Sequence, residues 1–201
     1  MKSIITSILL ALGITAGAQS IDRKAVVCRN NPHVTKQDKL SSLSVGNGHF
    51  AMTVDVTGLQ SYPRDYEDGV PLCAMSDWGW HSYPNTKALK PEETQKTMSL
   101  GHGRDEVFAV EYKTEGRNKD ATEYYRVNPH RLNLGNVGLE FCADGKQAGI
   151  GEISDVDQAL DMYAGKIHSS YKVFGSNVDV TTASLSSESA VISSVTTRLF
   201  I

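Results

Sequence analysis

Hydrophobic and polar residues alternate most clearly between His49 and Val56, in the run HFAMTVDV. Every second position is apolar, which places four side chains on one face of an extended chain: Phe50, Met52, Val54 and Val56. Asp55 falls on the opposite face. A period of two is that of a half-buried β-strand, and the turn residues Gly46-Asn47-Gly48 come just before it.

Further short strand patterns recur at nearly regular spacing through the rest of the chain. They cover residues 107–112, 137–142, 158–163, 167–174, 178–183 and 190–195. Turn residues separate them, among them Asp144-Gly145, a strong hairpin signal, and Gly175-Ser176-Asn177. This rhythm is typical of an antiparallel sandwich or barrel, so we expect an all-β fold.

Helical patterns are short and local. Residues 91–96 begin with a proline followed by two acids, which favours one or two helical turns, and residues 119–125 form a second candidate. Residues 62–85 have no sustained period, yet they contain both tryptophans of the chain. A long irregular segment inside a compact domain is usually functional or disordered, and the aromatic content argues against disorder. The sequence therefore predicts one or two short helices and a long aromatic loop.

The two ends of the chain carry apolar patterns of their own. Lys2, the apolar run Ile4–Ile14 and the small residues Ala16-Gly17-Ala18 form the three parts of a secretory signal peptide, residues 1–18. The apolar run is too short for a membrane span, which needs about 20 residues. We expect a β-sandwich domain over residues 19–201 that is periplasmic or secreted. Because the chain ends in Leu199-Phe200-Ile201, we also expect this domain to be truncated at its C-terminus.

Charge and cysteine content narrow the choice of partners. The formal net charge of −3 becomes −4 when Lys2 leaves with the leader, and no basic stripe follows the chain. This argues against nucleic acid and against a membrane surface as partners. The three cysteines, Cys28, Cys73 and Cys142, match no zinc spacing. An oxidising compartment would allow one disulfide, but the favoured interpretation is three single, mostly buried cysteines.

The most informative chemistry lies in the run WGWHSYPN of the aromatic loop. Tryptophan and tyrosine offer a flat apolar face and a polar edge, which suit the C–H faces and hydroxyl rims of sugars. We therefore predict carbohydrate contact by four residues: Trp78, Trp80, His81 and Tyr83. The competing interpretation is structural, because two tryptophans two positions apart on an extended segment point the same way and can share one packed cluster in the core or against another domain.

Other chemistry finds less support. The irregular segment contains four acids, Asp65, Glu67, Asp68 and Asp77, whose spacing singles out no catalytic pair. Three of them, Asp65, Glu67 and Asp68, resemble a solvated loop face. A triad drawn from Ser42, Ser44, His49 and Asp55 lacks the Gly-x-Ser-x-Gly elbow. No close histidine pair in the sequence indicates a metal site, and we expect neither a metal nor another cofactor.

Several stretches, taken in order, resemble the N-terminal region of secreted Bacteroidetes-type six-hairpin glycosidases, which are similar to glycoside hydrolase family sixty-five. They are residues 44–60 (SVGNGHFAMTVDVTGLQ), 78–85 (WGWHSYPN), 128–138 (NPHRLNLGNVG), 158–167 (QALDMYAGKI) and 178–182 (VDVTT). The resemblance implies a large sandwich, supersandwich-like in architecture, that precedes an (α/α) toroid. In such enzymes the catalytic acid lies in the toroid, and none of the toroid's motifs occurs in this chain.

Three functions follow, in order of preference. The first is a non-catalytic N-terminal sandwich of an exported glycoside hydrolase, with the toroid as the missing catalytic partner. The second is a free-standing carbohydrate-binding module that uses Trp78 and Trp80 as a stacking platform. The third is a small complete hydrolase that uses the loop carboxylates.

Overall fold

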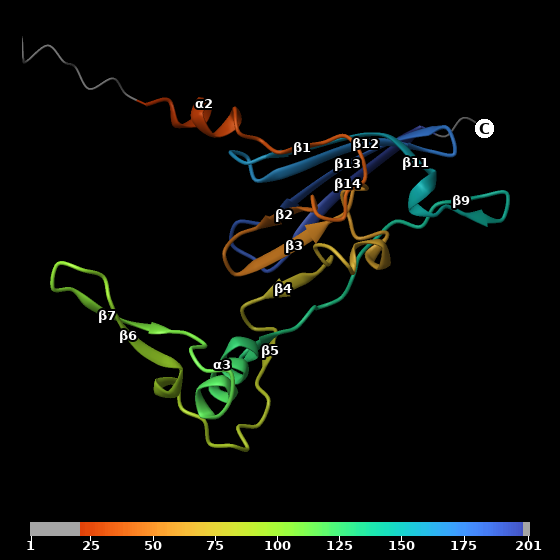
Figure 1. The fold of residues 1–201 in the computed structure, drawn as a ribbon. Coiled ribbons are helices and arrows are strands. Elements are labelled where there is room, and N and C mark those ends of the chain that lie inside the picture. The colour runs from red at the N-terminus through yellow and green to blue at the C-terminus, as the bar shows by residue number, and fades with distance from the viewer. Residues whose placement is uncertain (1–20, 199–201) are drawn as a thin grey trace, which may run out of the picture.

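The computed structural model describes residues 21–198. The described chain is mostly β-strand in antiparallel sheets, with two short α-helices, α2 (Arg23–Cys28) and α3 (Arg117–Val127). The predicted all-β, sandwich-like class is confirmed. Figure 1 shows two parts, a sandwich and an outer lobe that stands apart from it. The predicted leader and the apolar residues 199–201 lie outside the described residues.

The larger sheet of the sandwich has five strands in the order β1-β11-β12-β13-β14, each antiparallel to its neighbours. The strands are β1 (His33–Val34), β11 (Ile153–Asp161), β12 (Lys166–Val173), β13 (Ser176–Ser184) and β14 (Val191–Arg198). Phe174 and Gly175 form the two-residue turn between β12 and β13, and both have positive φ. Such a turn matches the right-handed twist of its strands, which explains why the predicted turn at Gly175 pins the register here.

The smaller sheet consists of β2 (Leu43–Gly46), β3 (Phe50–Val54) and β4 (Ala74–Ser76). The alternation predicted for β3 is confirmed, because Phe50, Met52 and Val54 are buried. Asp55 was predicted to face outward, and this is wrong: the strand ends at Val54 and the chain turns inward. The Asp55 carboxylate accepts hydrogen bonds from the Thr57 amide and hydroxyl and from the Tyr62 amide, so it organises the turn.

One hydrophobic core fills the space between the two sheets. Ile167 and Val180 from the larger sheet are buried in the same cluster as Val54 from the smaller one. Full burial of a side chain of this size stabilises the fold by about 1.5–3 kcal/mol. A buried amide also ties the sheets together, since Gln158 Nε2 donates to the Asp55 carbonyl and to Ser169 Oγ.

The outer lobe, residues 82–129, joins the sandwich through two adjacent segments. These segments form the short ladder of β5 (Trp80–His81) and β8 (His130–Arg131). The lobe contains the 3-10 helix η3 (Pro91–Thr94), the hairpin of β6 (Gln95–Ser99) and β7 (Asp105–Ala109), and α3. The two helices predicted here are confirmed, one as η3 and one within α3.

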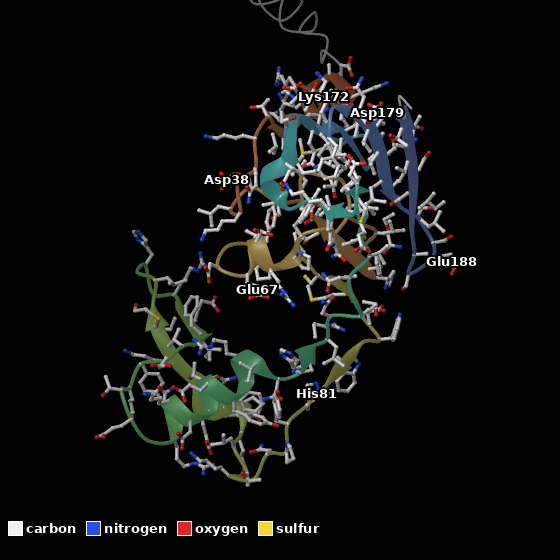
Figure 2. All side chains as sticks on the ribbon, turned by 90° about the vertical axis from the view of Figure 1, so that its right-hand side faces the viewer. Asp38, Glu67, His81, Lys172, Asp179 and Glu188 are labelled. Atoms are coloured by element: carbon white, nitrogen blue, oxygen red, sulfur yellow. The ribbon has the colours of Figure 1, made fainter. Side chains whose placement is uncertain are left out.

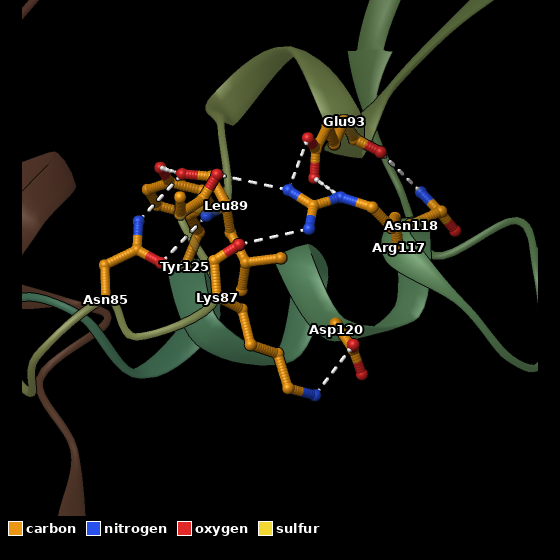
Figure 3. Close-up of polar contacts among 9 residues, drawn as sticks. Asn85, Lys87, Leu89, Glu93, Arg117, Asn118, Asp120 and Tyr125 are labelled. Atoms are coloured by element: carbon orange, nitrogen blue, oxygen red, sulfur yellow. Dashed lines mark hydrogen bonds and ion pairs between the residues drawn. The ribbon is translucent and has the colours of Figure 1, made fainter.

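Polar contacts hold the outer lobe together (Figure 3). Arg117 donates from Nε and Nη2 to the two carboxylate oxygens of Glu93, at 3.0 and 2.8 Å, and it also donates to the carbonyls of Lys87 and Ala88. Asn118 accepts from two backbone amides with Oδ1 and donates to two backbone carbonyls with Nδ2. Helix α3 is therefore fixed by hydrogen bonds from its first turn.

Between β8 and β11 the structure departs from the sequence prediction. The strand predicted at residues 137–142 is wrong over residues 137–141, which join no ladder; only its last residue, Cys142, lies in a strand. Isolated hydrogen bonds hold this segment in place. In one of them Gln60 N donates to the Val137 carbonyl at 2.8 Å. The predicted turn at Asp144-Gly145 is confirmed, between β9 (Cys142–Ala143) and β10 (Lys146–Gln147). Two 3-10 helices complete the described chain: η2 (Pro63–Tyr66) and η4 (Ile150–Glu152).

The cysteines remain single, as favoured, but they are not mostly buried. Cys28 and Cys73 are half-buried, and Cys142 is exposed. Each lies on a different part of the fold, with Cys142 on the β9–β10 hairpin. Within residues 21–198 no helix has the length and apolar character that crossing a membrane requires.

Candidate functional site

The aromatic loop turns sharply where it leaves β4. Gly79 N donates to Ser76 Oγ at 3.2 Å, and Trp80 N donates to the Trp78 carbonyl at 3.2 Å. A Cβ at position 79 would lie 2.8 Å from Leu134 Cδ2, so a larger residue there would require the Leu134 side chain to shift. Residues 77–79 therefore form a bend, and the expectation of one extended segment through both tryptophans is wrong.

Both tryptophans are exposed. Trp78 retains 64% of its surface and Trp80 retains 53%, as does Tyr83. Large aromatic side chains are highly buried on average. This exposure excludes packing of Trp78 and Trp80 in the core of the sandwich and leaves their rings open to a ligand or a partner.

The β5–β8 ladder places the predicted site residues on two faces. Trp80 lies opposite Arg131, and His81 lies opposite His130. Successive residues of a strand point to opposite faces, so Trp80 and His81 point away from each other. His81 instead packs edge-on against the rings of Tyr83, at 4.8 Å between ring centroids, and His130, at 5.4 Å. The four predicted residues thus do not form one surface.

Charged groups surround the bend that carries the tryptophans. His49 Nδ1 lies 2.7 Å from Asp77 Oδ2. The hydrogen bond and charge of His49 lower the pKa of Asp77 below its ordinary value, so the carboxylate is ionised at neutral pH. Arg131 Nη1 donates to the carbonyls of Ser76 and Asp77, which fixes the bend from the other strand segment.

These groups line a shallow cavity of about 280 Å³ beside the bend, where the ionisable side chains of the lining are His49, Asp77 and Arg131. A larger groove of about 600 Å³ opens at the edge of the core, between β3 and the start of β14. Its lining contains no charged side chain. A polar ligand therefore finds donors and acceptors at the first cavity and few at the second.

The remaining candidates separate in the structure. Asp65, Glu67 and Asp68 are exposed around η2, as predicted for a solvated loop face. The imagined triad does not form, because His49 meets Asp77 while Ser44 Oγ lies 3.0 Å from Thr53 Oγ1. Within the described chain, no three or more His, Cys, Asp or Glu side chains gather in a group able to hold a metal ion.

Sequence reasoning found the tryptophans but missed the groups beside them. Asp77 was considered only as a catalytic acid and His49 only as a triad member, and Arg131 was not among the predicted site residues. Their convergence depends on two pairings, β3 with β4 and β5 with β8. The second joins segments about fifty positions apart, and no local pattern in the sequence marks it.

Comparison of the chain with protein-family models, with curated proteins and with solved structures gave no match.

Proposed function

We propose that this chain is a carbohydrate-contacting β-sandwich domain of an exported glycoside hydrolase and that it carries no catalytic residues of its own. The observation that carries the proposal is the exposure of Trp78 and Trp80 beside the charged cavity of His49, Asp77 and Arg131. Under this proposal an (α/α) toroid performs the chemistry, and the domain acts in the periplasm or outside the cell.

The chemistry of the surface fits a sugar better than it fits other small ligands. A tryptophan face stacks on the C–H face of a pyranose ring, and the indole N–H remains free to donate to a hydroxyl. A carboxylate accepts hydrogen bonds and a guanidinium donates them, so Asp77 and Arg131 complement a hydroxyl rim. The openness of the site, in which the His49 side chain is 76% exposed, favours contact along a chain of sugars over enclosure of a single one.

The same observation supports a second candidate, a free-standing carbohydrate-binding module. The tryptophans are accessible without any other domain. The two candidates differ in whether the isolated chain binds saccharide by itself, which the module does and which the accessory domain does weakly or only together with a toroid.

Tryptophan emission tests both candidates directly, because the two tryptophans of the chain both lie in this site. The purified chain is titrated with gluco-, xylo-, manno- and galacto-oligosaccharides. We expect a saturable change in the emission of the wild type. Trp80→Ala should bind the same saccharide with an affinity at least tenfold lower. Tyr163→Ala is the matched control, an exposed aromatic on the turn after β11, and should bind like the wild type.

Two outcomes would count against the proposal. One is a chain that gives no emission change and no calorimetric heat with any saccharide, alone or with a toroid domain. The other is equal affinity, measured by calorimetry, for wild type and for the Trp78→Ala, Trp80→Ala double variant, which would place any saccharide site elsewhere.

A further inference from the structure

Two histidines face each other across the ladder that joins the sandwich to the outer lobe. His81 of β5 and His130 of β8 are direct partners in the antiparallel register. Their ring centroids lie 5.4 Å apart, with the ring planes at 80°. Figure 2 shows His81 in the narrow region between the two parts of the molecule. The pair lies on the face of the ladder opposite to Trp80 and Arg131.

This spacing is that of two imidazoles on one metal ion. A zinc ion sits at about 2.0–2.1 Å from a histidine nitrogen, so two imidazoles that share a tetrahedral ion have centroids roughly 5 Å apart. The observed centroid separation of 5.4 Å is close to this value. Direct partners in an antiparallel ladder also keep their Cβ atoms close, so the backbone holds the pair in place.

A second observation points the same way. His81 Nδ1 is buried and has no hydrogen-bond partner within the described chain. A buried polar atom without a partner costs free energy, and each one in a native fold calls for an explanation such as an ion. The ring of Tyr83 packs edge-on against the ring of His81, at 4.8 Å between ring centroids.

We propose that His81 and His130 together bind one divalent transition-metal ion. Neutral imidazole suits copper, zinc and nickel, and within this series affinity peaks at Cu²⁺. Water or a solvent ligand fills the remaining positions, because two protein ligands leave the ion open. The bound ion links the two segments that connect the outer lobe to the sandwich, and so limits movement between them.

The test is calorimetric titration of the untagged full chain with Zn²⁺ and with Cu²⁺ at a pH where imidazole is neutral. We expect one ion per chain, tighter for Cu²⁺, and a midpoint of thermal unfolding that rises with metal concentration because the ion binds the folded state. His130→Gln should weaken binding at least tenfold. His168→Gln is the matched control, because His168 is exposed on β12 and pairs with Thr181 alone.

Electron paramagnetic resonance of the Cu²⁺ complex gives a second measurement. The wild type should show coupling to two imidazole nitrogens, and His81→Gln should show coupling to one. Equal binding by His130→Gln and wild type, or a loss of binding in His168→Gln as large as in His130→Gln, would overturn the site. Since the pair faces away from Trp80 and Arg131, failure of either proposal leaves the other intact.

Discussion

The sandwich and the outer lobe reach their folds by different means. A single cluster of twelve buried hydrophobic side chains holds the sandwich. In the lobe the buried side chains are Leu89, Thr94, Asn118 and Ala121, and every residue of the β6–β7 hairpin is exposed. A two-stranded hairpin is marginal by itself in water, so the lobe depends on the polar contacts of Arg117 and Asn118. Apolar burial tolerates many substitutions of similar volume, whereas a polar cluster depends on particular atoms.

The largest loss of stability should come from a substitution that creates a cavity in the core of the sandwich. Ile167→Ala removes a fully buried side chain from the centre of the core, and we expect the free energy of unfolding to fall by about 2–5 kcal/mol. Chemical denaturation measures this. Ile192→Ala is the matched control on β14, where the side chain is 57% exposed, and should change stability by less than about 0.5 kcal/mol. Similar losses at the two positions would contradict a core confined to the space between the sheets.

The strands of the sandwich could be predicted because buried apolar residues such as Ile167 define them. Their apolar residues recur with period two, and their turns contain residues such as Gly175 that accept positive φ. The lobe lacks such a signal, because its order depends on Asn118 meeting backbone groups of residues 93, 110, 112 and 113. An asparagine in a polar helix has the same appearance in sequence whether or not it makes those bonds.

A smaller, local effect should follow from Asn118→Ala. The variant leaves the amides of Tyr112 and Lys113 and two carbonyls without their partner, at a cost of about 1–3 kcal/mol. We expect faster hydrogen exchange in residues 82–129 and unchanged exchange in β12 and β13. Asn177→Ala is the control at an exposed position of β13. Loss of protection in both parts would show that the lobe and the sandwich unfold as one unit.

The smallest effect concerns pH, and it should have opposite signs in the two parts. The hydrogen bond and charge of Arg117 lower the pKa of Glu93 below 4.5, so its contribution to stability is present above that value and is lost as pH falls through the folded pKa. Burial raises the pKa of Asp55 above 3.8, although three donors point at its carboxylate. Its contribution is present below 3.8 and is lost as pH rises through the folded pKa.

Carbon-13 NMR of the side-chain carboxyls measures both pKa values in one acid titration. In Arg117→Met the pKa of Glu93 should return toward 4.5 while that of Asp55 stays unchanged. If Asp55 titrated below 3.8, its three hydrogen bonds would outweigh burial, and the sandwich would share the acid sensitivity of the lobe.

The candidate site could be predicted only in part, for reasons that its residues make plain. Trp78 and Trp80 were identifiable because tryptophan is rare and the loop around them is irregular. Their exposure was not predictable, since it depends on the bend that Gly79 and Ser76 form. Arg131 could not be predicted as part of the site for a different reason. It donates to the carbonyl of Asp77, which lies 54 positions earlier in the sequence.

The two-residue ladder of β5 and β8 has a consequence for the modular construction of this chain. Because His81 and His130 are neighbours, the chain leaves the sandwich and returns to it at the same point. Topologically, residues 82–129 are an insertion in a hairpin, of the kind that exposed loop tips accept. Deleting them and closing His81 to His130 with a two-residue turn would keep every strand pairing of the sandwich. We therefore expect the lobe to be an exchangeable unit, which can be replaced or redesigned while the strand pairings of the sandwich are kept.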